Sequence, residues 1–489
     1  MNFEKLLKGC SVALVTGDLS IEILGLAYDS RDVCPGYVFF AIRGTRTDGN
    51  RFVPNAIAKG AAAIVSASPP IQAVTIPWVR VHDERAALAA MAGNFYAHPT
   101  EKLHLIGITG TNGKTTTTYL VESILKAAAK PAAAFGTIEY RGPGFGFAAE
   151  RTTPEAPDLE KLFKQVIDAG WEYAVMEVSS HAIEMKRVQE LRFEVAVFTN
   201  LSRDHLDFHG DMESYFQAKK KLFEGLNGVK PRVMVLNSDD PRYEDLRSID
   251  PSRVISYGMQ GAADICPLRH QFGWEGTEAR YKTPIGELEV RTSLMGKPNL
   301  FNIGAAIGAG IAVGVPPDAI SYGIEQLRNV PGRFEPVNAG QRFRVIVDYA
   351  HTDDALEKLL RSARDITTGR LILVFGCGGE RDRSKRPAMG KVAARESDYA
   401  IVTSDNPRGE DPLAIIHEIE EGMRNGQYQV IADRREAIRD ALEKAKEGDT
   451  VVIAGKGHEA YQTIGTTSYV FDDRVVAREL LYELVTGRN

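Results

Sequence analysis

The sequence predicts an α/β protein in which helices cover parallel sheets and the chain is divided into three domains. The chain has 489 residues, more than one hydrophobic core usually accommodates. Beyond residue 103, short and almost continuous apolar runs alternate with helical stretches, as they do when strands are buried on both faces of a parallel sheet. A Pro331-Gly332 break separates two such series. We therefore expect domains at residues 1–100, 101–332 and 333–489.

The composition is that of an ordinary soluble protein. Hydrophobic residues make up 44% of the chain, charged residues 25%, and the formal net charge is -6, which argues against a general nucleic-acid binder. No apolar run reaches the roughly 18–20 residues of a membrane helix, and the N-terminus shows no secretory leader, so a cytoplasmic location is predicted. The cysteines form no CxxC pair, and reduced thiols are expected at Cys10, Cys34, Cys266 and Cys377.

The first block shows the weakest pattern of the three. It contains short apolar segments, such as residues 37–42, and a helix-like segment at residues 56–65. Its polar strings YDSR, at residues 28–31, and GTRTDGNRF, at residues 44–52, resemble loops and by themselves indicate no function. A smaller α/β domain is expected here.

The second block contains four predicted strands, at residues 103–109, 173–178, 194–200 and 232–237. Open parallel sheets bind their ligands beyond the carboxyl ends of the strands. The polar residues that follow these runs are therefore the first candidates for a site. Glu177 at a strand end suits a metal-binding carboxylate, with a purely structural cap as the alternative.

The segment GTNGKTTT, at residues 110–117, follows a predicted strand and precedes a helical stretch at residues 119–130. That order is typical of a phosphate-binding loop. Gly110 and Gly113 let backbone amides approach phosphates, Lys114 would contact the β- and γ-phosphates, and Thr115 would hold Mg²⁺. The strict pattern has glycine where this chain has Ile108. A chance Gly-Lys-Thr turn is the alternative, and the flanking strand and helix argue against it.

The third block contains predicted strands at residues 344–349, 371–376, 399–404 and 450–455. The string DNPR, at residues 405–408, follows one of them, and its proline stiffens the loop. The planar guanidinium of Arg408 can hold a carboxylate at two points. The alternative is a surface turn with an incidental arginine.

Several of these strings together resemble the Mur ligase family over nearly the whole chain. They are GTNGKTT (110–116), EVSSH (177–181), NLSRDHLD (200–207), SYFQAKKKLF (214–223), KPNLFNIGAA (297–306), PGRFE (331–335), VDYAH (347–351), DNPR (405–408) and AGKGHE (454–459). The resemblance implies a central P-loop parallel-sheet ATPase domain, a C-terminal Rossmann-like domain and a smaller α/β N-terminal domain. Lys297-Pro298 and Asp353 depart from the commoner family residues.

The resemblance also implies an ATP and Mg²⁺ site. Catalytic roles fall to Lys114, Glu177, His205 and Lys219, and the metal ligands are Thr115, Glu177, His205 and Lys219. Lys219 would act as a carbamate formed with carbon dioxide, which requires a neutral amine that burial favours. The implied nucleotide contacts are Gly110, Thr111, Asn112, Gly113, Lys114, Thr115, Thr116, Asn302, Arg333 and Asp348, with Asn299 beside Asn302 near the base.

The substrate residues are implied by the same resemblance. The UDP-sugar and its peptide would contact Tyr28, Ser30, Thr45, Arg46, Thr47, Thr152, Thr153, Ser179 and Arg187. The incoming amino acid would contact Arg381, Asp405, Asn406, Pro407, Arg408, Gly455 and Glu459. Arg408 would pair with the extra carboxylate of meso-diaminopimelate, which lysine lacks, and a site built for that carboxylate rejects an analogue without it.

The implied activity is ATP-dependent amide formation through an acyl phosphate. The implied substrates are UDP-N-acetylmuramoyl-L-alanyl-D-glutamate and meso-diaminopimelate, in peptidoglycan precursor synthesis, by a monomer without nucleic-acid or membrane partners. Two alternatives share this chemistry, a lysine-adding ligase and a folylpolyglutamate synthase, and DNPR argues against both. A nucleotide-dependent switch or motor is a third alternative, but the chain has no NKxD guanine-reading motif.

Overall fold

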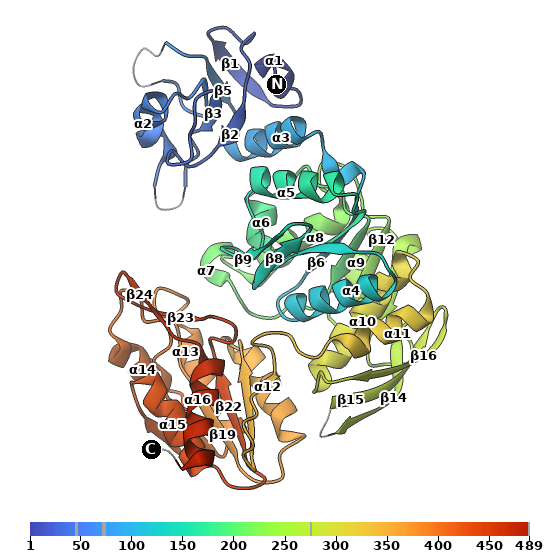
Figure 1. Ribbon diagram of the computed structural model, residues 1–489, viewed down its shortest axis with the longest axis vertical. Coiled ribbons are helices and arrows are strands. Elements are labelled where there is room, and N and C mark those ends of the chain that lie inside the picture. Colours follow the sequence, from blue (N-terminus) through green and yellow to red (C-terminus); the bar gives the residue numbers. More distant parts are fainter. Residues whose placement is uncertain (45–46, 71–74, 274–275, 488–489) are drawn as a thin grey trace. The chain divides into compact units, whose positions relative to one another are not determined.

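The structure is a computed structural model that describes residues 1–44, 47–70, 75–273 and 276–487 (Figure 1). The chain forms two compact units. The first comprises residues 1–109, 130–196 and 217–234, and the second comprises residues 110–129, 197–216 and 235–489. Parallel strands covered by helices occur in both, which confirms the predicted α/β class. The domain boundaries at residues 100 and 332 stay predictions.

The N-terminal sheet has five strands in the order β1-β5-β4-β3-β2. Its strands β2 to β5 run parallel, and the edge strand β1 is antiparallel to β5. Buried apolar residues on the two sides of the sheet form separate clusters. The elements are α1 Phe3–Leu6, β1 Val12–Thr16, β2 Gly25–Ala27, β3 Tyr37–Phe40, α2 Val53–Ala58, β4 Ala63–Ser66, β5 Trp78–Val81 and α3 Glu84–Tyr96.

The predicted helix-like segment at residues 56–65 is wrong in its second half. Helix α2 ends at Ala58, and residues 63–66 form the buried strand β4. Gly60 adopts φ +90° between them, a conformation that ends a helix at little cost for glycine. Burial between two parallel neighbours then decides in favour of a strand, although alanine favours helices.

The central sheet has eight strands in the order β13-β12-β11-β6-β10-β7-β8-β9. The four strands predicted in this block are all present, as β6, β10, β11 and β12. Strand β10 pairs in parallel with both β6 and β7. The strands are β6 His104–Thr109, β7 Ala132–Phe135, β8 Glu139–Gly142, β9 Phe145–Ala148, β10 Tyr173–Glu177, β11 Val195–Phe198, β12 Val233–Asn237 and β13 Val254–Tyr257.

Helices of this block include the two that the sequence predicted. The helix expected at residues 119–130 overlaps α4, which begins earlier, at Lys114, and ends at Ala127, and the one at residues 214–223 is part of α8. Helix α4 packs against α10 and α11. The helices are α4 Lys114–Ala127, α5 Ala156–Asp168, α6 Ser180–Glu184, α7 Leu206–His209, α8 Met212–Glu224, α9 Tyr243–Arg247, α10 Lys297–Ala312 and α11 Pro317–Gln326.

A small antiparallel sheet of three strands was not expected from the sequence. It consists of β14 Cys266–Gly273, β15 Gly276–Thr283 and β16 Gly286–Thr292. Alternate residues of β15 and β16 are buried, and α11 packs on β16. Alternating polar and apolar residues with Arg and Glu on the outer face account for its weak apolar signal.

The C-terminal sheet has six strands in the order β17-β18-β22-β19-β20-β21. The four predicted strands are present as β18, β19, β20 and β22, which run parallel. Helices α12, α13 and α14 supply apolar residues to one core cluster, and α15 and α16 supply the other. The strands are β17 Glu335–Pro336, β18 Arg344–Asp348, β19 Leu371–Phe375, β20 Tyr399–Val402, β21 Tyr428–Val430 and β22 Thr450–Ala454.

The same block ends with a hairpin and a long helix. The remaining elements are α12 Asp353–Arg364, α13 Lys385–Glu396, α14 Pro412–Glu420, α15 Arg434–Lys444, β23 Tyr461–Ile464, β24 Thr467–Val470 and α16 Asp473–Thr486. Among the residues that the structure describes, no helix is both long enough and apolar enough to cross a membrane.

Candidate functional site

The glycine-rich loop lies between β6 and α4, as predicted. Gly110 and Gly113 have φ +146° and +88°. A Cβ atom would lie 1.9 Å from the Thr199 hydroxyl at Gly110 and 2.3 Å from the Asn302 amide oxygen at Gly113, so only glycine fits at either position. The predicted residue Asn302 therefore contacts the loop itself. Its amide nitrogen donates to the side chain of Asn299 at 2.9 Å.

The segment after β11 holds the loop in place. The backbone N–H of Thr111 donates to the carbonyl of Asn200 at 2.8 Å, and that of Asn112 donates to the Asn200 side chain at 3.0 Å. The Thr199 hydroxyl donates to the carbonyl of Asn112 at 2.6 Å. Sequence reasoning missed the positioning roles of Thr199 and Asn200.

Lys114 and Thr115 open α4, and the backbone N–H groups in the first turn of a helix favour an anion. The Lys114 ammonium donates to the carbonyls of Gly110 and Thr111 at 2.9 Å each, so its charge lies over the loop. Thr115 and Thr116 are buried in the first turn. These positions suit the phosphate contacts that the sequence predicted.

Arg333 and Asp348 flank the start of the C-terminal sheet. The Arg333 guanidinium lies 4.4 Å from the Tyr349 ring centroid and donates to the Thr115 hydroxyl at 3.3 Å. Asp348 accepts from the backbone N–H groups of Phe334 and Ala350, at 2.7 Å each. Burial raises the pKa of Asp348, and Arg333 opposes that rise. The structure thus brings the predicted Arg333 to the phosphate loop.

His205 precedes α7 in the left-handed conformation, with φ +54°. Its Nε2 lies 3.3 Å from the carboxylate of Asp204. Burial opposes ionisation of Asp204, but the nearby His205 and His351 prevail and lower its pKa. Tyr215, buried on α8, lies edge-on to the His205 ring, and its hydroxyl is 3.2 Å from that of Thr111. Tyr215 thus connects the phosphate loop with the His205 segment, a role that sequence reasoning missed.

Glu177 ends β10 and is only 1% exposed. Its carboxylate accepts from the backbone N–H and the hydroxyl of Thr137, at 2.9 Å each. A Cβ atom on Gly136 would lie 2.4 Å from this carboxylate, so Gly136 leaves the space that Glu177 occupies. Lys219, on α8, is 2% exposed.

The predicted metal ligands are divided between the two units. Glu177 and Lys219 belong to the first, and Thr115 and His205 to the second. A buried carboxylate and a hydroxyl are oxygen donors of the kind that Mg²⁺ prefers. Within residues 1–44, 47–70, 75–273 and 276–487, no three His, Cys, Asp or Glu side chains are grouped as a metal site. The predicted metal ligands include only two side chains of these types, Glu177 and His205, so this absence does not test them. Their joint binding of Mg²⁺ stays a prediction.

The residues predicted for the peptide part of the substrate lie together in the first unit. The Thr153 hydroxyl donates to the carbonyl of Glu177 at 2.8 Å, and Ser179 caps α6. Arg187 donates to the carbonyl of Thr153 at 3.1 Å, and the hydroxyls of Thr152 and Thr137 are 3.1 Å apart. These contacts form one polar surface beyond the end of β10.

Three arginines share one buried carboxylate beside this surface. Glu155 lies 3.0 Å from Arg187 and 3.8 Å from Arg85, and it also pairs with Arg151. Burial lowers the pKa of Arg187, and Glu155 opposes that change. The surplus positive charge suits an anionic ligand. Sequence reasoning missed Glu155, Arg85 and Arg151, which carry no motif.

The predicted residues of the first block are placed only in part. Tyr28 donates its hydroxyl to Asp158 on α5 at 2.6 Å, so that hydroxyl already has a partner. Burial and then Asp158 raise the pKa of Tyr28. Ser30 is buried, and Thr47 is exposed, with its carbonyl accepting from the N–H of Gly44 at 2.9 Å. Two further predictions, Thr45 and Arg46, lie outside the described residues.

In the C-terminal block, the DNPR string forms a buried loop after β20. Arg408 has φ +51°, and its guanidinium donates to the carbonyl of Gly379 at 2.7 Å. Asn406 donates to the carboxylate of Glu459 at 2.8 Å. Gly455 leaves room for Asp405, whose Oδ2 would lie 3.1 Å from a Cβ atom there. Pro407 completes the loop, and the structure thus brings these predicted residues together.

Arg381 lies at the edge of this site and is exposed. Its Cγ and the Arg408 guanidinium both lie within 4.0 Å of the position of a Cβ atom on Gly378, so the two arginines flank that glycine. Burial and then Asp405 raise the pKa of Glu459. Two arginines and two carboxylates in one place can hold the carboxylate and the ammonium of an amino acid.

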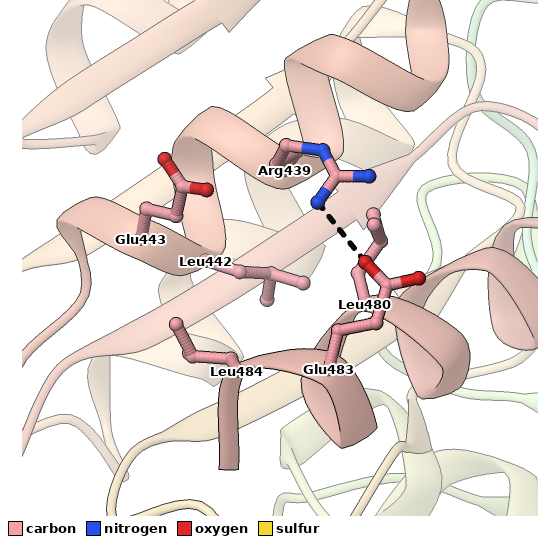
Figure 2. Close-up of a pocket in the computed structure, with 6 residues that line it drawn as sticks. All are labelled: Arg439, Leu442, Glu443, Leu480, Glu483 and Leu484. Carbon is pink, nitrogen blue, oxygen red and sulfur yellow. Dashed lines mark hydrogen bonds and ion pairs between the residues drawn. The ribbon is translucent and has the colours of Figure 1, made fainter. Parts of the chain in front are cut away.

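A separate shallow pocket lies between α15 and α16 (Figure 2). Arg439 and Glu483 form an ion pair of 3.0 Å at its rim. Its lining consists of Arg439, Leu442, Glu443, Leu480, Glu483 and Leu484, which include no predicted site residue.

The sequence matches three models of known protein families. Residues 22–96 match the Mur ligase family catalytic domain, residues 108–310 the Mur ligase middle domain, and residues 332–457 the Mur ligase glutamate ligase domain. The chain therefore belongs to the Mur ligase family, a class of ATP-dependent amide ligases. This membership confirms the three-part fold that the motifs implied.

Several relatives share one name, UDP-N-acetylmuramoyl-L-alanyl-D-glutamate–2,6-diaminopimelate ligase. The relative from Solibacter usitatus is 48% identical over 94% of both chains, and that from Gloeobacter violaceus is 49% identical over 94% of both. A solved structure of a ligase with this name is 31% identical, with a TM-score of 0.70 over 99% of each chain. A folylpolyglutamate synthase from Mycobacterium tuberculosis, 18% identical with a TM-score of 0.63 over 82% of this chain and 95% of that one, shares the fold alone.

Proposed function

We propose that this protein is the ligase that adds meso-diaminopimelate to UDP-N-acetylmuramoyl-L-alanyl-D-glutamate with hydrolysis of ATP. One observation carries the choice of amino acid. The DNPR loop presents Arg408 near the buried Asp405 and the half-buried Glu459, so a carboxylate and an ammonium can bind side by side. The name shared by relatives at 48% and 49% identity supports the same substrates.

The nucleotide would bind at the loop of residues 110–116. Lys114 and the N–H groups that begin α4 would hold its phosphates, and Arg333 would contact them from the C-terminal block. Mg²⁺, when bound, would offset the charge that builds on the transferred phosphoryl oxygens. The terminal carboxylate of the precursor would attack the γ-phosphorus of ATP, so that ADP leaves and the carboxylate becomes an acyl phosphate.

The amine of diaminopimelate would then attack the activated carbonyl carbon, and phosphate would leave. Arg187 and its neighbours Thr153 and Ser179 would hold the peptide end of the precursor. Arg408 and Glu459 would hold the far end of the amino acid. Fixing both partners converts an encounter in solution into a step within one complex.

The proposed magnesium site includes a modified lysine. Glu177, His205 and Lys219 would contact Mg²⁺ with Thr115, and Lys219 would carry a carbamate. Lys219 is 2% exposed, and burial in general favours the neutral form of an amine, which carbamate formation requires. The protein would act as a monomer in the cytoplasm, with domains at residues 1–100, 101–332 and 333–489.

The test is phosphate release from ATP with the UDP-linked dipeptide, in the presence of meso-diaminopimelate or L-lysine. We expect release with diaminopimelate only. Arg408→Ala should lower kcat/KM for diaminopimelate about 100-fold or more, as expected for loss of a charge-assisted pair in a buried site. Arg424→Ala, at an exposed arginine of the same block, is the matched control.

Each other outcome points to a different enzyme. Release with lysine alone would keep the ligase chemistry and discard the assigned amino acid. No release with either amino acid would return the question to the folate-type alternative.

A further inference from the structure

Lys456 is a lysine with no solvent exposure inside the proposed amino-acid site. It lies in the loop after β22, between Gly455 and Gly457. Its ammonium donates to the side chain of Asn406 at 3.2 Å and to the carbonyl of Tyr461 at 2.5 Å. Burying an ammonium is costly unless nearby carboxylates compensate for it.

Two carboxylates face this ammonium. Lys456 Nζ lies 3.7 Å from Asp405 Oδ1 and 3.6 Å from Glu459 Oε2. Asp405 Oδ1 is buried and has no hydrogen-bond partner among the described residues. The other buried cation nearby, Arg434, is already paired with the equally buried Asp473 at 2.7 Å.

The charges around the acidic pair can therefore be counted. Asp405 and Glu459 contribute two negative charges and Lys456 one positive charge, since Arg434 and Asp473 cancel. The remaining single negative charge is neutralised by one ammonium, while Arg408 is available for one carboxylate. One ammonium and one carboxylate are what the far end of a diamino diacid presents.

We propose that Lys456 is a positioning residue that offsets one of the two carboxylates, Asp405 and Glu459, so that the site accepts one substrate ammonium. This inference rests on the proposed function. Lys456 acts through the two carboxylates and contacts no reacting atom. The groups that face Glu459 and set its charge state are Asp405, Lys456, Arg408, Arg434, Tyr349 and Tyr461.

The direction of the pH effect follows from these contacts. Burial and Asp405 raise the pKa of Glu459, and Lys456 and Arg408 oppose that rise. Without Lys456, Glu459 would take up a proton at a higher pH and would then no longer attract an ammonium. The acid side of the pH profile for diaminopimelate would therefore move upward.

The experiment compares Lys456→Met with the wild-type enzyme by phosphate release across pH 5.5–9. We expect KM for diaminopimelate to rise about tenfold or more, with KM for ATP and for the UDP-linked dipeptide within about twofold. The acid limb of kcat/KM for diaminopimelate should shift up by about one pH unit. Lys456→Arg, which keeps the charge, should retain the wild-type limb even where kcat falls. Lys391→Met, at an exposed lysine of α13, is the matched control.

An unchanged acid limb in Lys456→Met, or an equal rise in all three KM values, would overturn the role of Lys456. A wild-type enzyme that is inactive with diaminopimelate would instead refute the proposed function before any variant is compared. If Lys456→Met does not fold, calorimetry on the wild-type enzyme replaces it. Diaminopimelate binding at pH 7.5, in buffers of different ionisation enthalpy, should release no protons, and release of about one proton would contradict the inference.

Discussion

Two of the proposed site residues adopt a backbone conformation that side chains other than glycine rarely take. His205 has φ +54° and Arg408 has φ +51°. Such a residue costs on the order of 1 kcal/mol and persists only where its surroundings enforce it. At Arg408 the surroundings are its N–H bond to Thr463 at 3.0 Å and its carbonyl bond from Gly465 at 2.6 Å. The enforced backbone conformation therefore sets the direction of the Arg408 guanidinium. No sequence pattern predicts this conformation.

Glu160 on α5 is a buried acid outside the proposed site. It is 1% exposed, and neither carboxyl oxygen has a hydrogen-bond partner among the described residues. Burial and then the charge of Glu190 raise its pKa to about 8, from an ordinary 4.5. The folded protein therefore holds a proton between about pH 4.5 and 8 that the unfolded chain releases, so Glu160 lowers stability as the pH rises through that range.

We predict that Glu160→Gln removes this pH dependence. Relative to wild type, the free energy of unfolding of the variant should increase by about 2–4 kcal/mol between pH 5 and pH 8. Urea denaturation at the two pH values measures the difference. Glu172→Gln, at an exposed glutamate, should show no such trend. A constant difference between Glu160→Gln and wild type would contradict the buried, protonated acid.

At the scale of elements, one ion pair joins α13 to the loop that follows β20. Arg386 on α13 has no exposed surface and donates to both carboxylate oxygens of Glu410, at 2.9 Å each. It also reaches Glu418 on α14 at 3.0 Å. The hydrogen bonds from Arg386, followed by that from the N–H of Glu380, lower the pKa of Glu410 to about 2. The pair holds the Arg408 loop against the loop that carries Gly379.

We predict that Glu410→Gln weakens both the fold and the selectivity for the amino acid. The variant should unfold about 1–3 kcal/mol more easily at pH 7, because Arg386 loses a charged partner. Since the folded pKa of Glu410 is depressed, its contribution exists above about pH 4.5 and disappears as the pH falls toward 2. The difference in the free energy of unfolding between wild type and Glu410→Gln should therefore become smaller at acidic pH.

Urea denaturation at pH 7 and pH 4 checks the stability, and KM values check the selectivity. KM for diaminopimelate should rise several-fold while that for ATP stays constant. Glu421→Gln, at an exposed glutamate next to α14, is the control. A loss of stability that is equal at both pH values would show that the charge of Glu410 is not responsible.

At the scale of the molecule, the six-stranded sheet of the C-terminal block has buried cores formed by its own helices. The sheet is covered on both faces, and each face has its own cluster of buried apolar residues. Chains with a closed core of this kind usually fold alone. The buried pair Arg434–Asp473, at 2.7 Å, lies within the same block and needs no partner from elsewhere.

We predict that residues 333–489 expressed alone form a folded domain with one cooperative thermal transition, measured by circular dichroism. A fragment of residues 353–489 should not fold, because it lacks β17 and β18, and β18 pairs directly with β22. A gradual, non-cooperative transition in the longer fragment would contradict the predicted boundary at residue 332.

Much of this architecture could be predicted because it depends on local patterns. Eight apolar runs in the second and third blocks were predicted as strands, and all are present, since strands buried on both faces must be apolar throughout. The phosphate loop was predicted because a glycine-rich turn between a strand and a helix is typical of phosphate binding. Strands β14 to β16 were not predicted, because one face of their sheet is exposed and its residues are polar. Strand β4 was not predicted, because its alanine-rich segment has the composition of a helix and only the neighbouring strands decide otherwise.

The sequence by itself determined the fold class, the phosphate loop and the residue types at the ends of the parallel strands. Only the tertiary structure decided which side chains share a site, because Asp405, Lys456 and Glu459 acquire a joint charge only when two loops meet. It also revealed partners without motifs, such as Arg85 and Arg151 at Glu155. A motif reflects what a position requires locally, whereas burial and charge depend on residues far apart in the chain.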